Sequence, residues 1–381
     1  MAGALPMSVP AAFERGADSL AVGVGISWWK RRRVGDFLAV QGSPPVFRHT
    51  VKGALRAAIA RGGAIGVWAT REPPGLAAAA AARGIKLIRI EDGFIRSVGL
   101  GSDFLPPVSL VFDGTGIYCD PTRPSDLETL LRETAFDAAL LARARRLVDC
   151  LVERGVTKYN LEQQAPAGSR PRIAWPPGKR RILVPGQVED DLSVRRGGGD
   201  VRGNLGLLAR VRAANPDAFI AYKQHPDVVA GHRKGALAEA AALRYADVVV
   251  RGGAMAALFG EIGELHTLTS LSGFEALLRR VPVTVYGRPF YAGWGLTRDM
   301  AMPPRGRTLS LEQLAAGALI LYPRYLDPVT RLPCDPETIV ERLAQPEAWR
   351  SGRLMRPVVF ARRLQGLLVE TLRPCVPHFS R

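Results

Sequence analysis

The stretch AIGVWATREPPGLAAAAAARGIKLIRIED, residues 64–92, contains two short apolar runs separated by an alanine-rich segment. The runs at 64–70 and 86–92 have the length and composition typical of buried strands. The segment between them ends in Arg83 and Gly84, as the C-terminus of a helix commonly does. A strand, a helix and a second strand of these lengths predict a βαβ unit and therefore a parallel sheet.

The same alternation of apolar runs and helical segments continues on both sides of this unit. In the N-terminal half we expect a strand at 20–26 and helices at 51–62 and 137–154. In the C-terminal half we expect strands at 181–186, 218–226, 246–252, 265–270 and 281–287, and helices near 202–216, 235–244 and 272–280. This pattern predicts an α/β protein with two Rossmann-like lobes, in which ligands bind where strands end.

A proline-rich stretch without hydrophobic periodicity, QQAPAGSRPRIAWPPGKRR at 163–181, separates the two halves. We therefore expect an N-terminal Rossmann-like lobe at 1–165, a linker at 166–179, a C-terminal Rossmann-like lobe at 180–336 and a helical, basic segment at 337–381. We expect this last segment to return to the N-terminal lobe.

Composition and charge restrict the class of protein. With 381 residues, of which 47% are hydrophobic, the chain can bury a large core and is too apolar to be disordered. Its formal net charge of +17 would attract an anionic partner, although an arginine-rich proteome explains the charge equally well. Because the arginines are dispersed and no nucleic-acid-binding motif occurs, we expect no nucleic-acid partner.

The cysteines and apolar segments bear on the cellular compartment. Cys119, Cys150, Cys334 and Cys375 never form a C-x-x-C pair, which argues against a zinc ribbon or a disulfide framework and fits a reducing compartment. The first twenty residues lack a basic leader, and no run of about 18 apolar residues occurs. We therefore expect a cytoplasmic protein that touches a membrane only from its side.

Two carboxylates end the strand expected at 86–92. Glu91 and Asp92 are followed by Gly93, which permits a sharp turn, and by Arg96 and Ser97. A carboxylate at this end of a strand faces the crevice of an open α/β sheet, where it can act as a general base or bind a substrate hydroxyl. The alternative is an aspartate that caps a turn beside an exposed neighbour.

A second candidate site, YKQHPD at 222–227, also follows a strand. Pro226 ends the pairing of the strand, and His225 offers a donor to a phosphate or a leaving group, beside Lys223 and Gln224. A packing or surface role is the alternative for a single histidine.

A third candidate site, LTSLSGFEALLRR at 268–280, places small residues before a helix. Ser270, Ser272 and Gly273 would open the helix, whose free N–H groups and positive dipole end suit a phosphate. Glu275 in the first turn could accept ribose hydroxyls or complete the helix cap. Together with His225 in the same lobe, this segment indicates a pocket for a nucleotide phosphate.

The stretch PGQVEDDLSVRRGGGD at 185–200 carries more acid than a turn requires. A turn needs one Asp or Asn and one glycine, whereas Glu189, Asp190 and Asp191 are adjacent. Their crowding would raise the pKa of one carboxyl unless cations compensate, and Arg195 and Arg196 could do so. The stretch is therefore either a solvated loop or a site.

Several common cofactor motifs are absent from the sequence. No G-x-G-x-x-G motif follows a strand, no G-x-x-x-x-G-K-[ST] motif occurs, and the five histidines show no metal-ligand spacing. A pyrophosphate donor often recruits a divalent metal, whereas a donor with one phosphate can be served by a histidine and a helix end. We therefore expect a nucleoside-monophosphate sugar as donor, with no metal and no cofactor.

Eight segments in a fixed order resemble one known family. They are GISWWKRR, EDGFIRSVGLGSD, GVTKYN, GQVEDDLSV, YKQHPD, SLSGFEALL, VYGRPFYAGWGLT and YPRYLDPVT, and they extend from about Gly23 to about Pro336. Together they are similar to the capsule polysaccharide biosynthesis family, whose members include retaining β-Kdo transferases. Each motif is weak alone, and their order makes the resemblance specific.

The resemblance implies a glycosyltransferase of the GT-B type, with CMP-Kdo in the C-terminal lobe and a glycolipid or oligosaccharide acceptor in the N-terminal lobe. It implies that Asp191 is the nucleophile and that Glu91 and Asp92 face the acceptor. The residues expected to bind the donor are Gln187, Ser193, Arg195, Lys223, His225, Pro226, Ser270, Ser272, Gly273 and Glu275. Arg195 and Arg196 would bind the carboxylate of the sugar.

The implied chemistry also has a stereochemical outcome. CMP-Kdo is β-configured, so a β-linked product implies retention, and retention by double displacement needs a carboxylate at the anomeric carbon. His225 and the helix start at Ser272 would stabilise the departing CMP phosphate. The alternatives are an inverting, sialyltransferase-like CMP-sugar transferase and a non-catalytic component of capsule assembly or export. Family modules often occur as a tandem pair, and this sequence holds one, so the acceptor and linkage stay open.

Two aromatic segments leave alternatives open. WWKRRR at 28–33 could bind an anionic lipid-linked acceptor or the inner face of the cytoplasmic membrane, where other capsule biosynthesis proteins could be partners. It could equally form an amphipathic helix with a solvated face. VYGRPFYAGWGLT at 285–297 could form a wall for cytosine or sugar, although a packed loop between the lobes is favoured.

Overall fold

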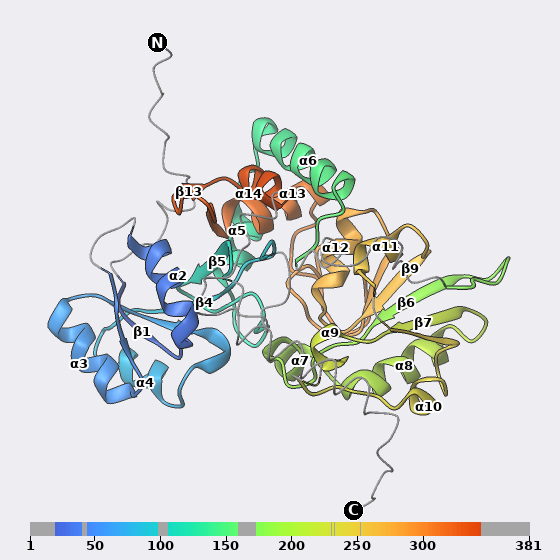
Figure 1. Cartoon of the computed structure of the whole chain (residues 1–381), viewed down its shortest axis with the longest axis horizontal. Helices are drawn as coiled ribbons and strands as arrows, with labels where there is room; N and C mark the ends of the chain where they lie inside the picture. The colour runs from blue at the N-terminus through green and yellow to red at the C-terminus, as the bar shows by residue number, and fades with distance from the viewer. Residues whose placement is uncertain are drawn as a thin grey trace, which may run out of the picture.

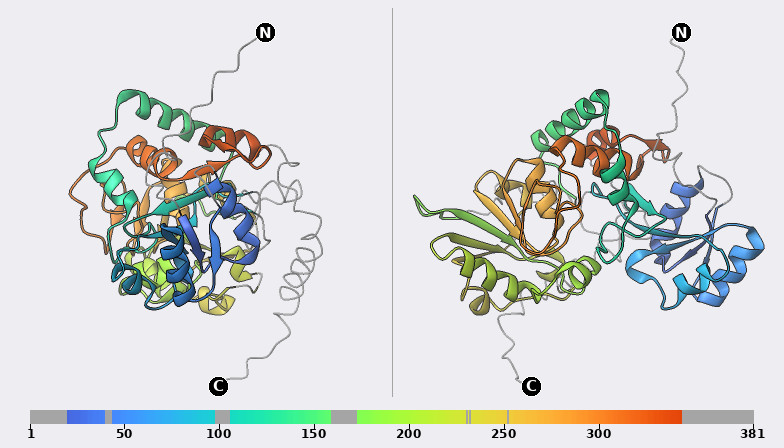
Figure 2. Two further views of the ribbon diagram at one scale, coloured as in Figure 1. Left: turned by 90° about the vertical axis from the view of Figure 1, so that its left-hand side faces the viewer. Right: turned by 180° about the vertical axis from the view of Figure 1, so that it is seen from behind.

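The computed structural model describes residues 20–39, 44–97, 106–158, 173–229, 231, 233–251 and 253–343. They form two β-sheets that lie next to each other, each covered by helices (Figures 1 and 2). The α/β architecture with two Rossmann-like lobes, expected from the alternation of strands and helices, is confirmed.

The first sheet has seven strands in the order β13-β12-β5-β4-β3-β1-β2. They are β1 (Leu20–Val24), β2 (Val46–Arg48), β3 (Ala64–Trp68), β4 (Leu87–Asp92), β5 (Ser109–Asp113), β12 (Arg324–Leu326) and β13 (Pro333–Cys334). From β2 to β4 the strands are parallel, and from β4 through β13 each pair is antiparallel. The strands β1 and β3 are buried along their whole length, which explains their continuous apolar sequence.

The helices of the first lobe begin and end with clear capping signals. They are α2 (Trp28–Ala39), α3 (Val51–Arg61), the short 3₁₀ turn η1 (Ala69–Arg71), α4 (Leu76–Ala81), α5 (Asp126–Glu133) and α6 (Ala138–Glu153). The Thr50 side chain caps α3 by accepting from the Gly53 N–H, and Gly62 ends the same helix at a φ of 62°. Asp137 caps α6 in the same way, so this long helix matches its predicted range closely.

The second sheet has six parallel strands in the order β11-β10-β9-β6-β7-β8. They are β6 (Arg181–Pro185), β7 (Phe219–Lys223), β8 (Val248–Val250), β9 (Glu264–Thr267), β10 (Val283–Val285) and β11 (Arg298–Asp299). The helices are α7 (Leu192–Gly197), α8 (Gly203–Ala214), α9 (Pro226–Val229), α10 (Glu239–Ala242), α11 (Met255–Phe259) and α12 (Leu271–Leu278). Because the chain leaves β6 toward β7 on one side and later returns through β9 on the other, the sheet has a switch point at β6.

The chain returns to the first lobe earlier than predicted. After α13 (Leu311–Ala315) and the π-helical segment η4 (Ala316–Leu321), β12 pairs with β5 of the first sheet, and α14 (Pro336–Leu343) contacts α6 and β12. The range 180–336 expected for the C-terminal lobe therefore includes two strands of the first sheet. The partner of a two- or three-residue strand is a tertiary choice, which no local pattern reveals.

The predicted segments that join or follow the lobes lie partly outside the described residues. Of the expected linker at 166–179, residues 173–179 are described, and there Trp175 donates to the Glu261 carboxylate at 3.0 Å and packs edge-on against Phe219. This part of the linker belongs to the second lobe. Of the expected C-terminal segment at 337–381, the described part is α14, which lies on the first lobe.

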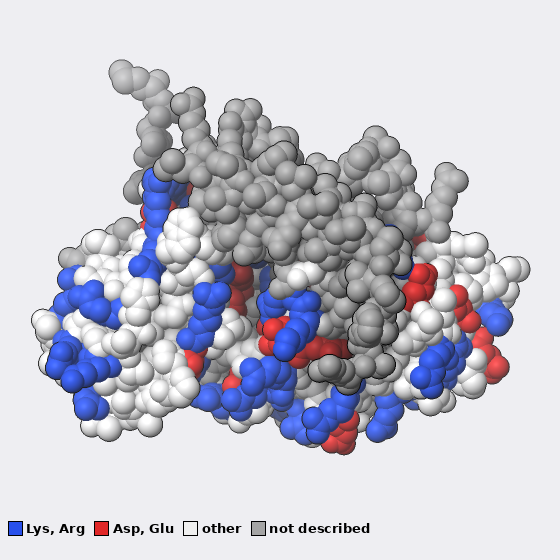
Figure 3. Space-filling view, turned by 60° about the horizontal axis from the view of Figure 1, so that its bottom comes forward, with Lys and Arg blue, Asp and Glu red and all other residues white. Residues whose placement is uncertain are grey.

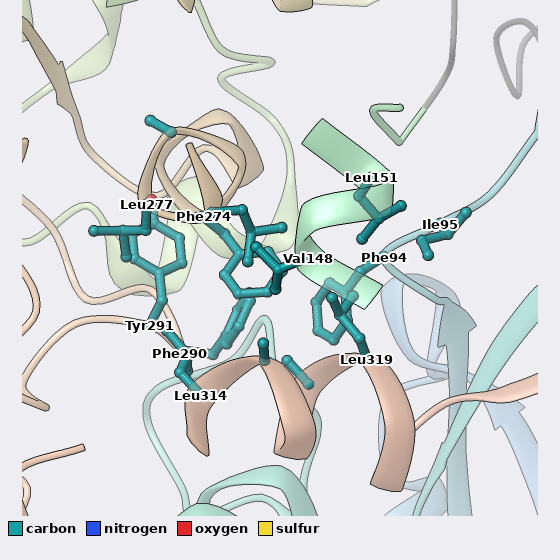
Figure 4. Packing of buried hydrophobic residues seen from close by; sticks show 14 of the residues in the cluster. Phe94, Ile95, Val148, Leu151, Phe274, Leu277, Phe290, Tyr291, Leu314 and Leu319 are labelled. Carbon is teal, nitrogen blue, oxygen red and sulfur yellow. The ribbon is translucent and has the colours of Figure 1, made fainter. Parts of the chain in front are cut away.

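One apolar core extends through both lobes. Phe94, just after β4, packs against Phe274 of α12 and against Phe290, with ring centroids 5.8 Å and 4.6 Å away (Figure 4). Trp294 is fully buried in the same core and donates from its indole N–H to the Phe290 carbonyl at 2.8 Å. The 285–297 segment is thus a packed loop between the lobes, as favoured. The shared core fixes the end of β4 relative to α12.

The segment WWKRRR forms the start of α2, and its cations do not share one solvated face. Trp28 is 65% exposed, whereas Lys30 and Arg33 are buried. The Lys30 ammonium lies 3.5 Å from the centroid of the Trp68 ring, a cation–π contact, and pairs with Asp92. Within the described part of the chain, no helix is long and apolar enough to cross a bilayer.

Candidate functional site

The residues singled out from the sequence lie at the carboxyl ends of four strands, where the two lobes meet. Glu91 and Asp92 end β4, Gln187 follows β6, His225 follows β7, and Ser270 follows β9. In the second sheet these ends belong to the switch point, which is the usual ligand position in an open parallel sheet. On the face shown in Figure 3, acidic side chains are visible in the middle of the molecule as well as toward its right-hand end and lower edge, and basic side chains lie among and around them.

Glu91 is a buried carboxylate with one unused oxygen. Its Oε1 accepts from the Asp92 N–H at 3.0 Å, whereas Oε2 has no hydrogen-bond partner among the described residues. Burial, together with the negative charge of Asp92, raises the pKa of the Glu91 carboxyl to about 7. A carboxyl with this pKa can take up and release a proton near neutral pH, as a general acid or base must.

Its neighbour Asp92 has the opposite character. The Arg96 Nε donates to Asp92 Oδ2 at 2.8 Å, and the Lys30 ammonium lies 3.2 Å from Oδ1. Burial opposes ionisation of Asp92, but the charges of Arg96 and Lys30 outweigh it and hold the pKa of this carboxyl well below its usual range. The two adjacent carboxylates therefore divide into one proton-exchanging group and one permanent anion held by two cations.

The three carboxylates at 189–191 also divide, and two of them have structural partners. Glu189 Oε1 accepts from the Asn204 N–H at 2.8 Å and so holds the first turn of α8. Asp190 is exposed and pairs with Arg233 at 3.2 Å. The cation that compensates Asp190 is thus Arg233, which no sequence pattern had indicated, in place of Arg195 or Arg196.

Asp191 is the carboxylate of this group that faces the junction of the lobes. It is the N-cap of α7, and its Oδ1 accepts from the Leu192 N–H at 2.9 Å. Ser193, two residues further along, accepts a long hydrogen bond of 3.4 Å from the Thr269 hydroxyl. Arg195 and Arg196 lie exposed in the last turn of α7. The three adjacent carboxylates therefore have three different partners: Glu189 accepts from the Asn204 N–H, Asp190 pairs with Arg233, and Asp191 accepts from the Leu192 N–H.

The Gln187 side chain connects the ends of β6 and β9. Its Oε1 accepts from the Thr267 hydroxyl at 3.0 Å and from the N–H groups of Leu268 and Thr269 at 3.1 and 3.2 Å. Its Nε2 donates to the Thr269 hydroxyl at 2.9 Å. Gln187 is buried, so the amide expected to touch the donor instead fixes the turn after β9 that precedes Ser270.

Replacing Gln187 by Leu is expected to lower the free energy of unfolding by about 2–4 kcal/mol, because two buried N–H groups lose their acceptor. Urea denaturation followed by circular dichroism measures this change. The matched control is Gln224→Leu, since Gln224 is half-buried and makes one long bond of 3.5 Å to the Leu237 carbonyl. Equal, small losses for both variants would contradict the connecting role of Gln187.

The end of β7 supplies a lysine and a histidine. Burial lowers the pKa of Lys223 to about 8. Burial also lowers the pKa of His225, although Asp227 and Asp191 oppose this effect. The Asp227 N–H donates to His225 Nδ1 at 3.2 Å, so the neutral ring carries its proton on Nε2, which can donate to an anion. Pro226 begins α9, where its missing N–H has no helical partner to lose.

In the segment after β9, more backbone N–H groups have hydrogen-bond partners within the protein than expected. Ser270 caps α12 by accepting from the Ser272 N–H at 3.2 Å, and the Gly273 N–H donates to the Ser270 carbonyl at 3.0 Å. Two of the N–H groups expected to face a phosphate therefore have internal partners. Gly273 is required by packing, since an added Cβ would overlap the Tyr291 hydroxyl.

Glu275 is buried and connects the second lobe to residue 158. Its Oε1 accepts from the Lys158 N–H at 2.8 Å, and burial raises the pKa of its carboxyl. The oxygen expected to accept from a ribose is thus used in a contact between the segment after α6 and α12.

Two residues that sequence reasoning missed as site residues, Tyr118 and Cys119, lie close enough to both acidic groups to feel their charges. Burial raises the pKa of the Tyr118 hydroxyl and of the Cys119 thiol, and the charges of Glu91 and Asp191 raise both further. One carboxylate from each lobe therefore acts on the same pair of side chains. Tyr118 also donates to the Asp92 carbonyl at 3.0 Å. These residues follow β5, a short apolar strand that was not predicted from the sequence.

The chemical groups at the site are carboxylates, a lysine, a histidine and backbone N–H groups at the start of α12. Across the described ranges, no three His, Cys, Asp or Glu side chains lie close enough together to hold a metal ion. The arrangement can bind an anionic substrate between the lobes, supply a carboxylate at Asp191 and exchange a proton at Glu91.

Comparison with known proteins shows a family and several proteins to which this chain is similar. Residues 63–325 match the family described as capsule polysaccharide biosynthesis protein. Capsule polysaccharide modification protein LipA of Neisseria meningitidis is 43% identical over 321 residues, which cover 84% of the chain and 45% of LipA. Lipopolysaccharide-processing protein LpsZ of Rhizobium meliloti is 45% identical over 244 residues, covering 63% of the chain and 54% of LpsZ. The chain thus spans about half the length of these curated relatives.

Two solved structures share the fold over nearly their entire length. Both are of KpsC from Thermosulfurimonas dismutans, one titled a beta Kdo 2,7 transferase and the other a beta Kdo 2,4 transferase. The first is 33% identical with a TM-score of 0.69 and covers 86% of this chain and 99% of that chain. The second is 31% identical with a TM-score of 0.70 and covers 85% and 98%.

Proposed function

The chain belongs to the capsule polysaccharide biosynthesis protein family, and from this membership we propose that it is a retaining glycosyltransferase that moves Kdo from CMP-Kdo to a glycan or glycolipid acceptor. The observation that carries the proposal is the position of Glu91 at the end of β4 in one lobe and of Asp191 after β6 in the other, both close enough to the buried Tyr118 and Cys119 for their charges to raise the pKa of each. Retention by double displacement needs these two carboxyl groups on opposite sides of one anomeric carbon. The two solved relatives, both described as beta Kdo transferases, support Kdo as the transferred sugar.

In the first displacement, a carboxylate oxygen of Asp191 attacks the anomeric carbon of Kdo. The bond between that carbon and the phosphate oxygen breaks, and its electron pair leaves with CMP. The Nε2 proton of His225 and the positive end of α12 would stabilise the phosphate as its charge grows. The product is a covalent ester between Kdo and Asp191.

In the second displacement, an acceptor hydroxyl attacks the same carbon and the ester bond to Asp191 breaks. The hydroxyl proton passes to Glu91, whose unused Oε2 and pKa of about 7 suit it for this step. Arg96 and Lys30 keep Asp92 ionised, and the negative charge of Asp92 in turn helps to raise the pKa of Glu91. Two inversions at one carbon give net retention.

A lipid-linked acceptor would bring the protein to the inner face of the cytoplasmic membrane. We place the acceptor on the first lobe, beside Glu91 and the exposed Trp28 of α2. This assignment follows from the position of the general base, because the acceptor hydroxyl must reach Oε2 of Glu91.

The proposal is tested by incubating the protein with freshly made CMP-Kdo and a synthetic glycolipid that ends in Kdo. The expected result is release of CMP and a new Kdo residue whose linkage is β by nuclear magnetic resonance. An α-linked product would replace the proposal by an inverting transferase. Absence of both CMP release and CMP binding would favour a non-catalytic role in capsule assembly or export.

A further inference from the structure

The carboxyl ends of β1, β2 and β3 form a part of the first lobe that neither displacement described above uses. The chain leaves β1 toward β2 on one side and later continues through β3 on the other, so the first sheet has its own switch point between β1 and β3. Gly25 follows β1 at a φ of 68°, and an added Cβ there would lie 2.7 Å from the Arg71 carbonyl oxygen. The turn after β1 and the η1 turn after β3 therefore approach each other closely at the usual ligand position of an open sheet.

Two arginines bond to adjacent residues of the turn after β1. Arg71 donates from Nη1 to the Ser27 hydroxyl oxygen at 2.7 Å. Arg31, in the first turn of α2, donates from Nε to the Ile26 carbonyl at 3.3 Å and from Nη2 to His49 Nε2 at 3.1 Å. Side chains that follow three different strands thus gather at one turn.

The positive charges of these two arginines are not balanced within the protein. In the part of the chain that the structure describes, neither guanidinium group has a carboxylate as partner. Glu72, next to Arg71 in the sequence, instead pairs with Arg89 at 2.8 Å. Two like charges at one turn repel each other, and an anion that binds between them relieves the repulsion. Arg31 is partly exposed and Arg71 is exposed, so an anion can reach both from solvent.

The two arginines lie on the same carboxyl edge of the sheet as the proposed general base. One strand, β3, separates β1 from β4, so two strand spacings place the turn after β1 about 10 Å from the end of β4. Lys30, the residue before Arg31, pairs with Asp92 at 3.2 Å, which shows that the first turn of α2 reaches the end of β4. An acceptor whose hydroxyl lies at Glu91 can therefore extend along this edge to Arg31 and Arg71.

We propose that Arg31 and Arg71 bind an anionic group of the acceptor, a phosphate or a carboxylate, and so select acceptors that carry a negative charge. This inference rests on the proposed function, since it assumes that an acceptor reaches Glu91. A planar guanidinium group donates two parallel hydrogen bonds to either anion, so the two arginines position the acceptor as well as attract it.

The test measures the binding of three water-soluble β-Kdo glycosides by titration calorimetry in the absence of donor. The first carries a phosphate on its aglycone, the second keeps only the carboxylate of Kdo, and the third is the neutral methyl ester of the second. Replacing Arg71 by Met is expected to weaken at least one charged glycoside by about 10- to 100-fold and the neutral glycoside by less than threefold. A loss confined to the first glycoside would identify the bound group as a phosphate, and a loss that includes the second would identify it as a carboxylate.

Further variants separate charge recognition from a structural role. Arg31→Met is expected to give the same pattern as Arg71→Met, and Arg71→Lys is expected to keep part of the affinity because it keeps the charge. Arg83→Met is the matched control, because Arg83 is exposed, follows α4 at the amino edge of the sheet and donates to the Ala79 carbonyl at 2.9 Å. It should change none of the three affinities. Thermal unfolding of each variant verifies the fold.

The outcomes distinguish this inference from the function on which it rests. Equal weakening of all three glycosides, or no change for any of them, would overturn the inference. Unchanged glycoside binding with a loss of binding to phosphatidylglycerol vesicles would also overturn it, since the two arginines would then contact a membrane surface. Transfer from CMP-Kdo is measured separately. Failure of that transfer would overturn the proposed function, whereas charge-dependent binding of the glycosides would still show the anion site.

Discussion

Replacing Asp191 by Asn is expected to lower the rate of Kdo transfer by about 10⁴-fold or more while leaving the fold intact. Asparagine caps a helix as well as aspartate does, so the hydrogen bond to the Leu192 N–H survives. The amide oxygen is a poor nucleophile, however, and no covalent ester with the sugar can form. Replacement by Ala would additionally remove the cap and cost about 1 kcal/mol of stability.

Intact-mass spectrometry after mixing with CMP-Kdo shows the difference directly. The wild-type protein should gain the mass of one Kdo residue, and the Asp191→Asn protein should gain none. Asp190→Asn is the matched control, because Asp190 is the adjacent carboxylate but is exposed and pairs with Arg233. A mass increase that persists in Asp191→Asn, or transfer that survives within tenfold, would remove Asp191 from the reaction.

Replacing Glu91 by Gln is expected to slow transfer to the acceptor by about 10²- to 10⁴-fold, because the attacking hydroxyl loses its base. The first displacement does not use Glu91, so the covalent Kdo adduct should form and then accumulate. The Gln Oε1 can still accept from the Asp92 N–H, which keeps the local structure. Rapid-quench mass spectrometry with and without acceptor measures both steps.

The pH dependence of transfer provides a second measurement of the same group. The pKa of Glu91 is about 7 in the folded protein, so the wild-type rate should rise through that pH and level off above it, when the base is ionised. Glu91→Gln should lose this inflection. Glu72→Gln is the matched control, because Glu72 pairs with Arg89 of the same strand at 2.8 Å without touching Glu91. An unchanged profile in Glu91→Gln would assign the inflection to another group.

The same raised pKa predicts how stability changes with pH. A carboxyl whose pKa is raised from 4.5 to about 7 by folding favours the folded state when protonated. Its stabilisation is complete below about pH 4.5 and is lost as the pH rises through about 7. Glu91→Gln should therefore unfold at a higher temperature than wild type at pH 8, and at a similar temperature at pH 4.5.

Much of the fold could be predicted because its signals are local. The βαβ unit at 64–92 appears as β3, α4 and β4, and the long helix expected at 137–154 appears as α6. Apolar runs and capping residues act over a few positions, so they can be read without knowledge of the rest of the chain. The short strands β12 and β13 could not be predicted, because two or three residues carry no periodicity and β5, which pairs with β12, lies more than 200 positions away.

For the candidate site too, the positions of residues at strand ends could be predicted from the sequence, whereas contacts between residues far apart in the chain could not. Strand ends indicated where Glu91, Asp92, Gln187, His225 and Ser270 would lie, since side chains after parallel strands meet at one edge of a sheet. Nothing local indicated that Lys30, in a segment that could have been a solvated helix face, would pair with Asp92 across 62 positions. Lys158 stood in a motif of the family resemblance, but its pattern gave no sign of a contact with both lobes.

By itself, the sequence determined the α/β class, the two lobes and most of the parallel strands, and it indicated the strand ends at which candidate site residues would lie. The tertiary structure decided what each of those carboxylates can do. Adjacent residues with the same functional group, such as Glu91 and Asp92, differ because one was packed beside two cations and the other was buried with an unused oxygen. Protonation depends on burial and on charges brought near by folding, and these are properties of the assembled lobes.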